Sequence, residues 1–491
     1  MKLYKLILPV LLLFISVQLN AQDDSFWRAK ERSPLVDSSF KFNPYRPVAL
    51  IGGTNLAIWS FNRFATKEPW ARVNIHTMSK NMIRGFTWDS DGLETNMFSH
   101  PYHGNLYYNA ARSNGLNYWQ CIPYTFFGSF TWELLAETEP ASVNDLFATS
   151  VGGLAIGEIT HRLSYKILDE SATGFRRFGL ELAAGLINPM GFINRMIDGD
   201  VWKRKRRGYH RPYGNDDVNI ALGLGTTFIS ESSAPYKGGG AGVLDLSIAY
   251  NDPFEVSYPV PYEYFTMDAS FNVVGSQPFV GKMNILGLLY GKHYTPIKGH
   301  KMLVGAFQHL SYYDSKSGIK GSDVVPFKLA SAASFGGGIL YNLKNSNQSI
   351  DLKFGLIMNG ILMGGSASDY DKIGERDYNF GSGFSTLTHT EITFSNKAAF
   401  RLGAEIYQLY TWKGWNPDAD YSRVPPELLN VQGDKGNTTF LMLNPQFSIN
   451  INPNLAFRIN GYMYLRKTDY RYEKDVLFNT YETKASIHYK F

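Results

Sequence analysis

From about Asp216 to the end of the chain, apolar and polar residues alternate with a period of two. In residues 455–466, one parity carries Leu455, Phe457, Ile459, Met463 and Leu465, and the other carries Arg458, Asn460, Tyr462, Tyr464 and Arg466. Residues 244–250, 267–273, 350–356 and 400–406 repeat the pattern. Because successive side chains of a β-strand point to opposite faces, this half of the chain predicts strands with one apolar and one polar face.

A soluble β-sandwich would alternate in the same way, but three features favour a barrel that spans a membrane. Many of the alternating segments exceed about ten residues, the length that a tilted strand needs to cross a bilayer. Aromatic residues gather near strand ends, as at Tyr407, Tyr410 and Trp412, which is typical of the interfacial girdles of such barrels. The connections alternate between short, as at 450–454, and long, as at 416–436, as do periplasmic turns and outer loops.

The last strand carries a signal of its own. Ala485, Ile487, Tyr489 and Phe491 share one face, while Lys484, Ser486, His488 and Lys490 share the other. A final amphipathic strand that ends on Phe491 resembles the recognition signal of outer-membrane β-barrels, which implies the barrel-assembly machinery as a partner. About twelve segments follow from Val218 onward, and an even number suits a closed barrel. Closure is required because an open edge in lipid leaves amides unpaired at several kcal/mol each.

The first half of the chain predicts an N-terminal signal peptide and a helical domain instead of strands. Residues 1–21 have the charged start, short apolar run and small final residue of a secretory signal peptide, and residues 22–45 predict a flexible leader. Residues 46–212 predict a helical domain, with helices expected over 47–64, 105–113, 122–137, 142–168 and 178–197. Gly153 and Gly157, four apart, would let a neighbouring backbone approach closely. A single cysteine, Cys121, excludes an internal disulfide.

Composition agrees with a chain that meets both water and lipid. Aromatic residues make up 15% of the chain and charged residues 19%, and the mean hydropathy is −0.21, which excludes a helical membrane protein. The net charge is only +5, so nucleic-acid binding gains no support. A basic run stands out at Lys203, Arg204, Lys205, Arg206 and Arg207. It predicts either a solvated linker or a contact with anionic lipid head groups, which attract such residues at about 1 kcal/mol each.

Residues able to do chemistry concentrate between His100 and Arg162. His100 and His103 are predicted in a turn flanked by proline and glycine, and Glu133 and Glu137 on one helix face. Glu158 and His161 have the Glu-x-x-His spacing of helix-borne di-metal carboxylate sites. Three alternatives stay open: a structural network of buried charges, a general acid–base site, and a metal site. The metal, and any other cofactor, is left unidentified.

The motif string of this stretch is specific. It reads His-Pro-Tyr-His-Gly from His100, then Tyr-Asn-Ala-Ala-Arg-Ser-Asn-Gly, Trp-Glu, and Gly-Glu-Ile-Thr-His-Arg up to Arg162. It resembles an uncharacterised family of bacterial outer-membrane proteins whose N-terminal half is a domain of unknown function. The resemblance covers roughly residues 70–200. It implies a location in the Gram-negative envelope, and it brings no assigned catalytic residue.

Together these features predict an exported protein of the cell outer membrane. Its fold is expected to be mainly β, with an antiparallel transmembrane barrel of about twelve strands in 213–491 and an α-helical plug or periplasmic domain before it. One hypothesis is a structural or transport role, in which the helices plug or cap the barrel in contact with outer-membrane lipid. The alternative is an enzyme acting on lipid or lipopolysaccharide through His100, His103, Glu133, Glu158 and His161.

Overall fold

The computed structural model describes residues 43–491 apart from 89–90, 207–208, 210, 234, 256–259, 320, 323, 345–348, 372–376, 396, 422 and 425–428. The predicted signal peptide and nearly all of the leader lie outside the described residues. The chain divides into two compact units. One is helical and comprises the chain up to Asp89 and Glu94–Asp216, and the other comprises Ser90–Leu93 and Asp217–Phe491. The sequence placed its boundary at 212/213.

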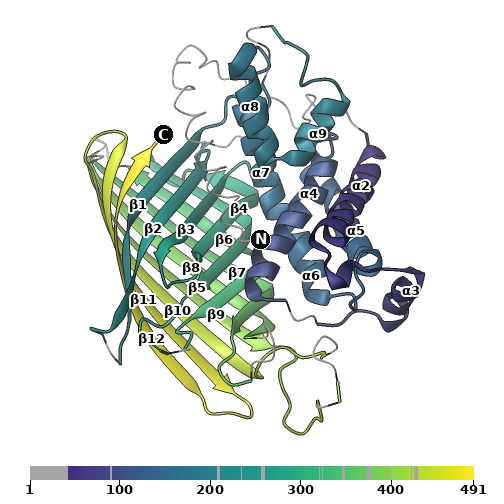
Figure 1. Cartoon of the computed structure of the whole chain (residues 1–491). Helices are drawn as coiled ribbons and strands as arrows, with labels where there is room; N and C mark the ends of the chain where they lie inside the picture. The colour runs from purple at the N-terminus through teal and green to yellow at the C-terminus, as the bar shows by residue number, and fades with distance from the viewer. Residues whose placement is uncertain are drawn as a thin grey trace. The chain divides into compact units, whose positions relative to one another are not determined.

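The second unit is a closed antiparallel barrel of twelve strands (Figure 1). Its strands are β1 (Val218–Glu231), β2 (Gly238–Tyr250), β3 (Phe265–Gly275), β4 (Val280–Tyr294), β5 (His300–Asp314), β6 (Lys328–Lys344), β7 (Ile350–Ala367), β8 (Tyr378–Phe394), β9 (Ala398–Thr411), β10 (Gly436–Asn450), β11 (Leu455–Tyr470) and β12 (Val476–Lys490). Each pairs with its sequence neighbours, and β1 pairs with β12 from Ala221↔Lys490 to Glu231↔Thr480. This pairing removes the edge, and it confirms the predicted fold class.

The two faces of the strands differ as the alternation predicts. On β11, Ile459 and Met463 are 44% and 49% exposed, whereas Asn460 and Arg466 are 3% and 1% exposed. Other strands also expose large apolar side chains, among them Leu224, Met358, Leu362, Phe384, Leu402, Phe447 and Ile487. A closed wall with an apolar exterior is what the bilayer requires of a spanning sheet. The barrel is therefore of the outer-membrane type, and the outer membrane is where the chain resides.

Loop lengths distinguish the two ends of the barrel. The end that carries the start of β1 and the end of β12 also has the short turns 395–397 and 451–454. The opposite end has the longer connections 315–327, 368–377 and 412–435, although it also has the short turn 276–279, and the first end also has the longer connection 251–264. On average the connections follow the predicted pattern, which is typical of a barrel whose end with the shorter turns faces the periplasm.

The helical unit contains α2 (Arg46–Ser60), η1 (Phe61–Thr66), η2 (Pro69–Ala71), α3 (Ile75–Arg84), η3 (Thr95–Ser99), α4 (His100–Arg112), α5 (Tyr118–Leu135), α6 (Val143–Phe147), η4 (Ala148–Gly152), α7 (Gly153–Ile167), α8 (Gly174–Ile187) and α9 (Pro189–Ile197). As predicted, a helical run begins at Ser142, whose hydroxyl accepts a hydrogen bond from the amide of Asp145 at 3.1 Å. Among the described residues, no helix has both the length and the hydropathy to cross a bilayer.

Three local predictions were wrong. His100 and His103 lie in α4 and not in a turn, because Pro101 occupies the first helical turn, where no amide donor is needed. The predicted helix 178–197 is two helices, since a proline disfavours helical geometry in the residue before it, here Asn188 at φ −134° and ψ 82°. Glu137 lies beyond the end of α5 at Leu135, so it does not share a helix face with Glu133.

Helices α4 and α7 pack at van der Waals distance through glycines. A β-carbon on Gly104 would lie 1.7 Å from the carbonyl oxygen of Thr149, and one on Gly153 would lie 2.5 Å from the carbonyl carbon of Gly104. A β-carbon on Gly157 would lie 2.5 Å from the ring of Tyr108. The predicted close approach at Gly153 and Gly157 is thus confirmed, and it brings the polar side chains of α4 and α7 within reach of each other.

We predict that Ile459→Arg destabilises the folded barrel by about 2–4 kcal/mol, because the guanidinium would face lipid near the midplane. Ile459 lies five positions along β11 from the end of the turn 451–454. At a rise of about 3.3 Å per residue and a tilt of about 40°, that distance is roughly half the height of the apolar band. Urea titration of folding into lipid vesicles measures the change. Ile451→Arg, at a turn residue 59% exposed, is the matched control and should cost at most about 1 kcal/mol. Equal costs would contradict the assigned faces.

Candidate functional site

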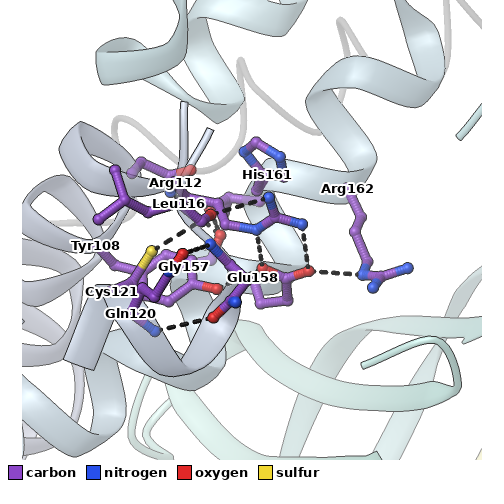
Figure 2. A network of polar contacts seen from close by, with 12 residues as sticks. Tyr108, Arg112, Leu116, Gln120, Cys121, Gly157, Glu158, His161 and Arg162 are labelled. Atoms are coloured by element: carbon purple, nitrogen blue, oxygen red, sulfur yellow. Dashed lines mark hydrogen bonds and ion pairs between the residues drawn. The ribbon is translucent and has the colours of Figure 1, made fainter. Parts of the chain in front are cut away.

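Glu158 is the centre of a buried polar cluster between α4 and α7 (Figure 2). Its Oε2 accepts a hydrogen bond from Arg112 Nε at 2.9 Å and another from the hydroxyl of Tyr108. Its Oε1 accepts from Arg162 Nε at 2.8 Å. Glu158 and Arg162 are one turn apart on α7, and Arg112 and Tyr108 are one turn apart on α4. Helical spacing and the glycine contact between the helices therefore assemble the cluster.

The carboxylate of Glu158 is held in its charged form. Burial acts to raise its pKa, but Arg112 and Arg162 outweigh that effect and lower the pKa to about 2. Arg112 also donates to the hydroxyl of Tyr213 at 2.8 Å and to the carbonyl oxygen of Leu116 at 3.2 Å. Such an anion, saturated by strong donors, has the contacts of a structural ion pair and not those of a proton donor.

His161 lies on α7 beside the cluster and is fully buried. Its ring packs against those of Tyr165 and Tyr213, at centroid distances of 4.9 and 5.8 Å. Burial, and then the positive charge of Arg112, hold the pKa of His161 well below its usual 6.5. The imidazole is therefore neutral at physiological pH.

His100, His103 and Glu133 form a second group near the start of α4. His103 Nε2 lies 2.8 Å from the hydroxyl of Tyr107, and its ring meets the Trp132 ring edge-on at 4.7 Å. Burial, and then His100, lower the pKa of His103 to about 3. His100 Nε2 lies 3.1 Å from Asp145 Oδ1. Glu133 Oε2 accepts a hydrogen bond from the backbone amide of Ser142 at 2.8 Å.

The five candidate residues thus fall into two groups along α4. His103 and Arg112 are nine residues apart in that helix, which at 1.5 Å per residue separates them by roughly 13 Å along its axis. Glu158 contacts Arg112 and Tyr108 in the C-terminal part of α4, and His161 follows it on α7. His100 and His103 lie in the N-terminal part of α4, and Glu133 lies on α5. The structure therefore does not bring all five residues together at one place. The structural, catalytic and metal-binding alternatives for them stay predictions.

The basic run after α9 is partly engaged in ion pairs. Lys203 lies 3.2 Å from Asp200, and Lys205 lies 2.6 Å from the buried carboxylate of Glu170. Arg204 and Arg206 are exposed, and Arg207 lies outside the described residues. Head-group binding by this run stays a prediction, and the two exposed arginines are best placed for it.

A packed layer crosses the lumen of the barrel, and the sequence did not reveal it. Its buried members are Tyr313, Phe327, Leu329, Ile361, Tyr407, Leu409, Phe440, Met442 and Tyr464; we call them the lumen layer. Ring centroids are 5.7 Å apart for Tyr313 and Phe440, and 4.1 Å apart for Phe327 and Tyr464. Tyr313 is on β5 and Phe440 on β10, with four strands between them on one side of the ring and six on the other. Their contact therefore spans the interior.

The lumen layer corrects one sequence interpretation. Tyr407 was assigned to an interfacial girdle, but it is fully buried inside the barrel and donates a hydrogen bond to Glu405 at 2.7 Å. Tyr410 on the same strand is 46% exposed and lies on the outer face, as a girdle residue would. Two tyrosines three apart on a strand point to opposite faces, so one strand cannot place both in the girdle.

Polar contacts also span the lumen. Lys282 on β4 lies 2.5 Å from Glu482 on β12, and its Nζ lies 3.3 Å from the ring centroid of Tyr462 on β11. Tyr313 donates to Glu405 Oε2 at 2.6 Å and accepts from Asn284 at 2.8 Å. These contacts pair Lys282 with Glu482, and Tyr313 with Glu405 and Asn284, within the barrel itself.

Arg466 on β11 bonds to residues of two loops, 315–327 and 368–377, at the end of the barrel opposite the turns 395–397 and 451–454. Its guanidinium pairs with both carboxylate oxygens of Asp369 in the loop 368–377, each at 2.7 Å. It also donates to the carbonyl oxygens of Val325 and Pro326 in the loop 315–327, at 3.3 and 3.2 Å. Bidentate pairing of this kind is strong and specific in geometry. Arg466 thereby links Asp369 with Val325 and Pro326 from inside the barrel.

Comparison with known proteins places part of the chain. Residues 85–190 match a family model described as Domain of unknown function (DUF3943), which confirms the resemblance drawn from the motifs between His100 and Arg162. No curated protein matches the chain. Among solved structures it is similar to the NanC porin, at 10% identity over 55% of this chain and 100% of that one, with a TM-score of 0.27. It is also similar to Omp33 of Acinetobacter baumannii, at 10% identity over 57% of this chain and 100% of that one, with a TM-score of 0.24. At such scores the fold rests on the strand pairing described above.

We predict that Glu158→Gln lowers the stability of the helical unit by about 3–5 kcal/mol, because two buried guanidinium groups lose their counter-charge. Hydrogen exchange of α4 and α7 in the full chain measures the loss, and Glu68→Gln, outside the cluster, is the control. Because the folded pKa of Glu158 is depressed, its contribution is present above the unfolded value near 4.5 and disappears as the pH falls toward about 2. Wild type and variant should converge over that range. A constant difference down to pH 2 would contradict the assigned ion pair.

Proposed function

We propose that this chain, which joins a DUF3943 domain to an outer-membrane β-barrel, has a structural role in the envelope, and that its barrel is closed along the lumen in the resting state. Any transport would then require the lumen layer to open. The observation that carries the proposal is the contact across the ring between Tyr313 on β5 and Phe440 on β10.

Barrel size supports this proposal. Side chains alone fill the interior of an eight-stranded barrel, whereas barrels of sixteen to eighteen strands leave an aqueous channel. Twelve strands lie between these limits, so large side chains are needed to span the interior. The chain supplies Tyr and Phe rings for this purpose from β5, β9, β10, β11 and the loop 315–327. We therefore assign closure of the lumen to the barrel's own side chains.

For the helical unit we propose a supporting role, as a cap or scaffold, in preference to catalysis. An enzyme needs its acid, base and substrate at one place. Here the carboxylate of Glu158 is saturated by Arg112, Arg162 and Tyr108, while His103 lies nine residues before Arg112 on α4. No observation on the described residues favours the enzyme over the structural role.

Two partners complete the proposal. The exposed Arg204 and Arg206 would bind the head groups of outer-membrane lipid. The assembly machinery would bind β12, whose outer face carries Ile487 and Tyr489 at 50% and 38% exposure. The backbone amide of Phe491 donates to the carbonyl oxygen of Ile220 at 3.0 Å, so this residue contributes to the closing pair of strands as well.

We predict that the purified wild-type protein shows no sustained conductance in planar lipid bilayers, and that Tyr407→Ala combined with Phe440→Ala opens a steady ionic current. The two changes remove aromatic rings from the middle of the lumen layer, and water can then cross it. The unitary conductance at fixed salt is the measurement.

Tyr410→Ala is the matched control, because Tyr410 is on the same strand as Tyr407 and points outward. It should leave the bilayer electrically silent. A wild-type protein that conducts steadily, or that admits sugars in a liposome-swelling assay, would contradict the closed lumen. Folding of each variant is checked by its faster migration unboiled than boiled in a detergent gel.

A further inference from the structure

The helical unit exposes apolar side chains on a surface that carries few acidic residues. Phe61, Phe64, Ile75, Ile83, Phe127 and Phe130 are between 43% and 86% exposed. The exposed cations Lys80 and Arg84 lie among them on α3. We call these eight residues the apolar–basic surface, and we infer that it binds the interfacial region of an anionic lipid bilayer as a membrane contact additional to the barrel.

Helix α3 has the properties of an interfacial helix. Asn74 and Thr77 form a complete capping box at its start, so the short helix is well defined. Asn81 points inward and donates to the carbonyl oxygen of Glu137 at 3.0 Å. Ile75 and Ile83, at 86% and 84% exposure, extend outward instead. A helix with apolar tips, lysine and arginine beside them and no acidic residue is the pattern that lies in a membrane interface.

Neighbouring elements continue the surface. Between Tyr118 and Trp132, α5 carries no Asp, Glu, Lys, Arg or His, and its Phe127 and Phe130 are 43% and 44% exposed. The Phe86 ring, just after α3, stacks on Phe130 at 6.0 Å. Trp70 in η2 packs on Trp132 of α5 at 6.2 Å, which brings the segment after η1 to the same helix. These ring contacts join the segment after α3, and η2, to α5 within the helical unit, whose helices Figure 1 shows.

The charge of the segment indicates which partner the apolar–basic surface binds. Residues 61–88 contain five basic residues and one acidic residue, Glu68. Anionic head groups attract such a segment, and the acyl region accepts the apolar side chains. A symmetric contact with a second copy through this same surface would instead bring Lys80 and Arg84 near like charges. The same chain spans a bilayer with its barrel. The inference rests on the outer-membrane location but does not require the lumen to be closed.

The test uses the full chain folded into lipid vesicles, with an environment-sensitive fluorophore on Ile83→Cys. Cys121 is fully buried, so the new thiol is the accessible one. We expect brominated phospholipid to quench this probe several-fold more than a probe on Thr173→Cys, an exposed position at the start of α8. Quenching should be stronger in phosphatidylcholine vesicles that contain phosphatidylglycerol than in those without it.

Lys80→Glu combined with Arg84→Glu should reduce the quenching in phosphatidylglycerol vesicles and change it little in pure phosphatidylcholine. Equal quenching of the probes at positions 83 and 173 in every vesicle would overturn the inference. The inference would also be overturned if the fluorescence emission of the probe at Ile83→Cys were blue-shifted in detergent to an extent that depends on protein concentration. The surface would then be a contact between copies of the chain. Neither outcome bears on bilayer conductance, so this inference and the closed lumen can fail separately.

Discussion

Packing across the lumen is the constraint on which the rest of the barrel depends. Closure between β1 and β12 satisfies the backbone in lipid, but it leaves an interior too wide for small side chains. The rings of Tyr313, Phe440 and Tyr464 meet in that space, and the hydroxyls of Tyr313 and Tyr464 donate hydrogen bonds to Glu405 and Glu482. Burial of aromatic surface inside the wall stabilises this packing, and the ion pair of Arg466 with Asp369 joins the loop residue Asp369 to β11.

The helical unit achieves rigidity by a different route. Its α4 and α7 approach so closely at Gly104 and Gly153 that apolar side chains cannot separate them. The charged groups of the interface must then satisfy each other, and Glu158 does so with Arg112 and Arg162. Removing one member of such a group leaves an uncompensated buried charge, which destabilises the fold. Ionisable residues of the kinds used in catalysis can therefore be required for stability alone.

Sequence periodicity was sufficient for the wall of the barrel. The alternation around Ile459 and the final strand that ends at Phe491 predicted which strand faces are apolar, about how many strands there are, and that the barrel is of the outer-membrane type. Each of these features can be read from one chain segment at a time. The lumen layer depends on which distant strands face each other across the ring. The contact of Tyr313 with Phe440 therefore had no local signal, and Tyr407 was misplaced in the girdle. The same limit applies to the cluster around Glu158. The sequence spacing predicted that Glu158 and His161 share a helix face, but only the packing of α4 on α7 shows that Arg112 and Tyr108 donate hydrogen bonds to the Glu158 carboxylate.

The most direct test of the closed lumen is the reactivity of a thiol placed inside it. Leu409→Cys in a Cys121→Ser background puts a cysteine in the lumen layer, at a position 3% exposed, and Val424→Cys supplies an exposed loop position for comparison. In the barrel folded into vesicles, a small water-soluble maleimide should label the cysteine at position 424 and leave that at position 409 unmodified until the protein is unfolded. Rapid labelling at position 409 in the folded barrel would contradict a closed lumen.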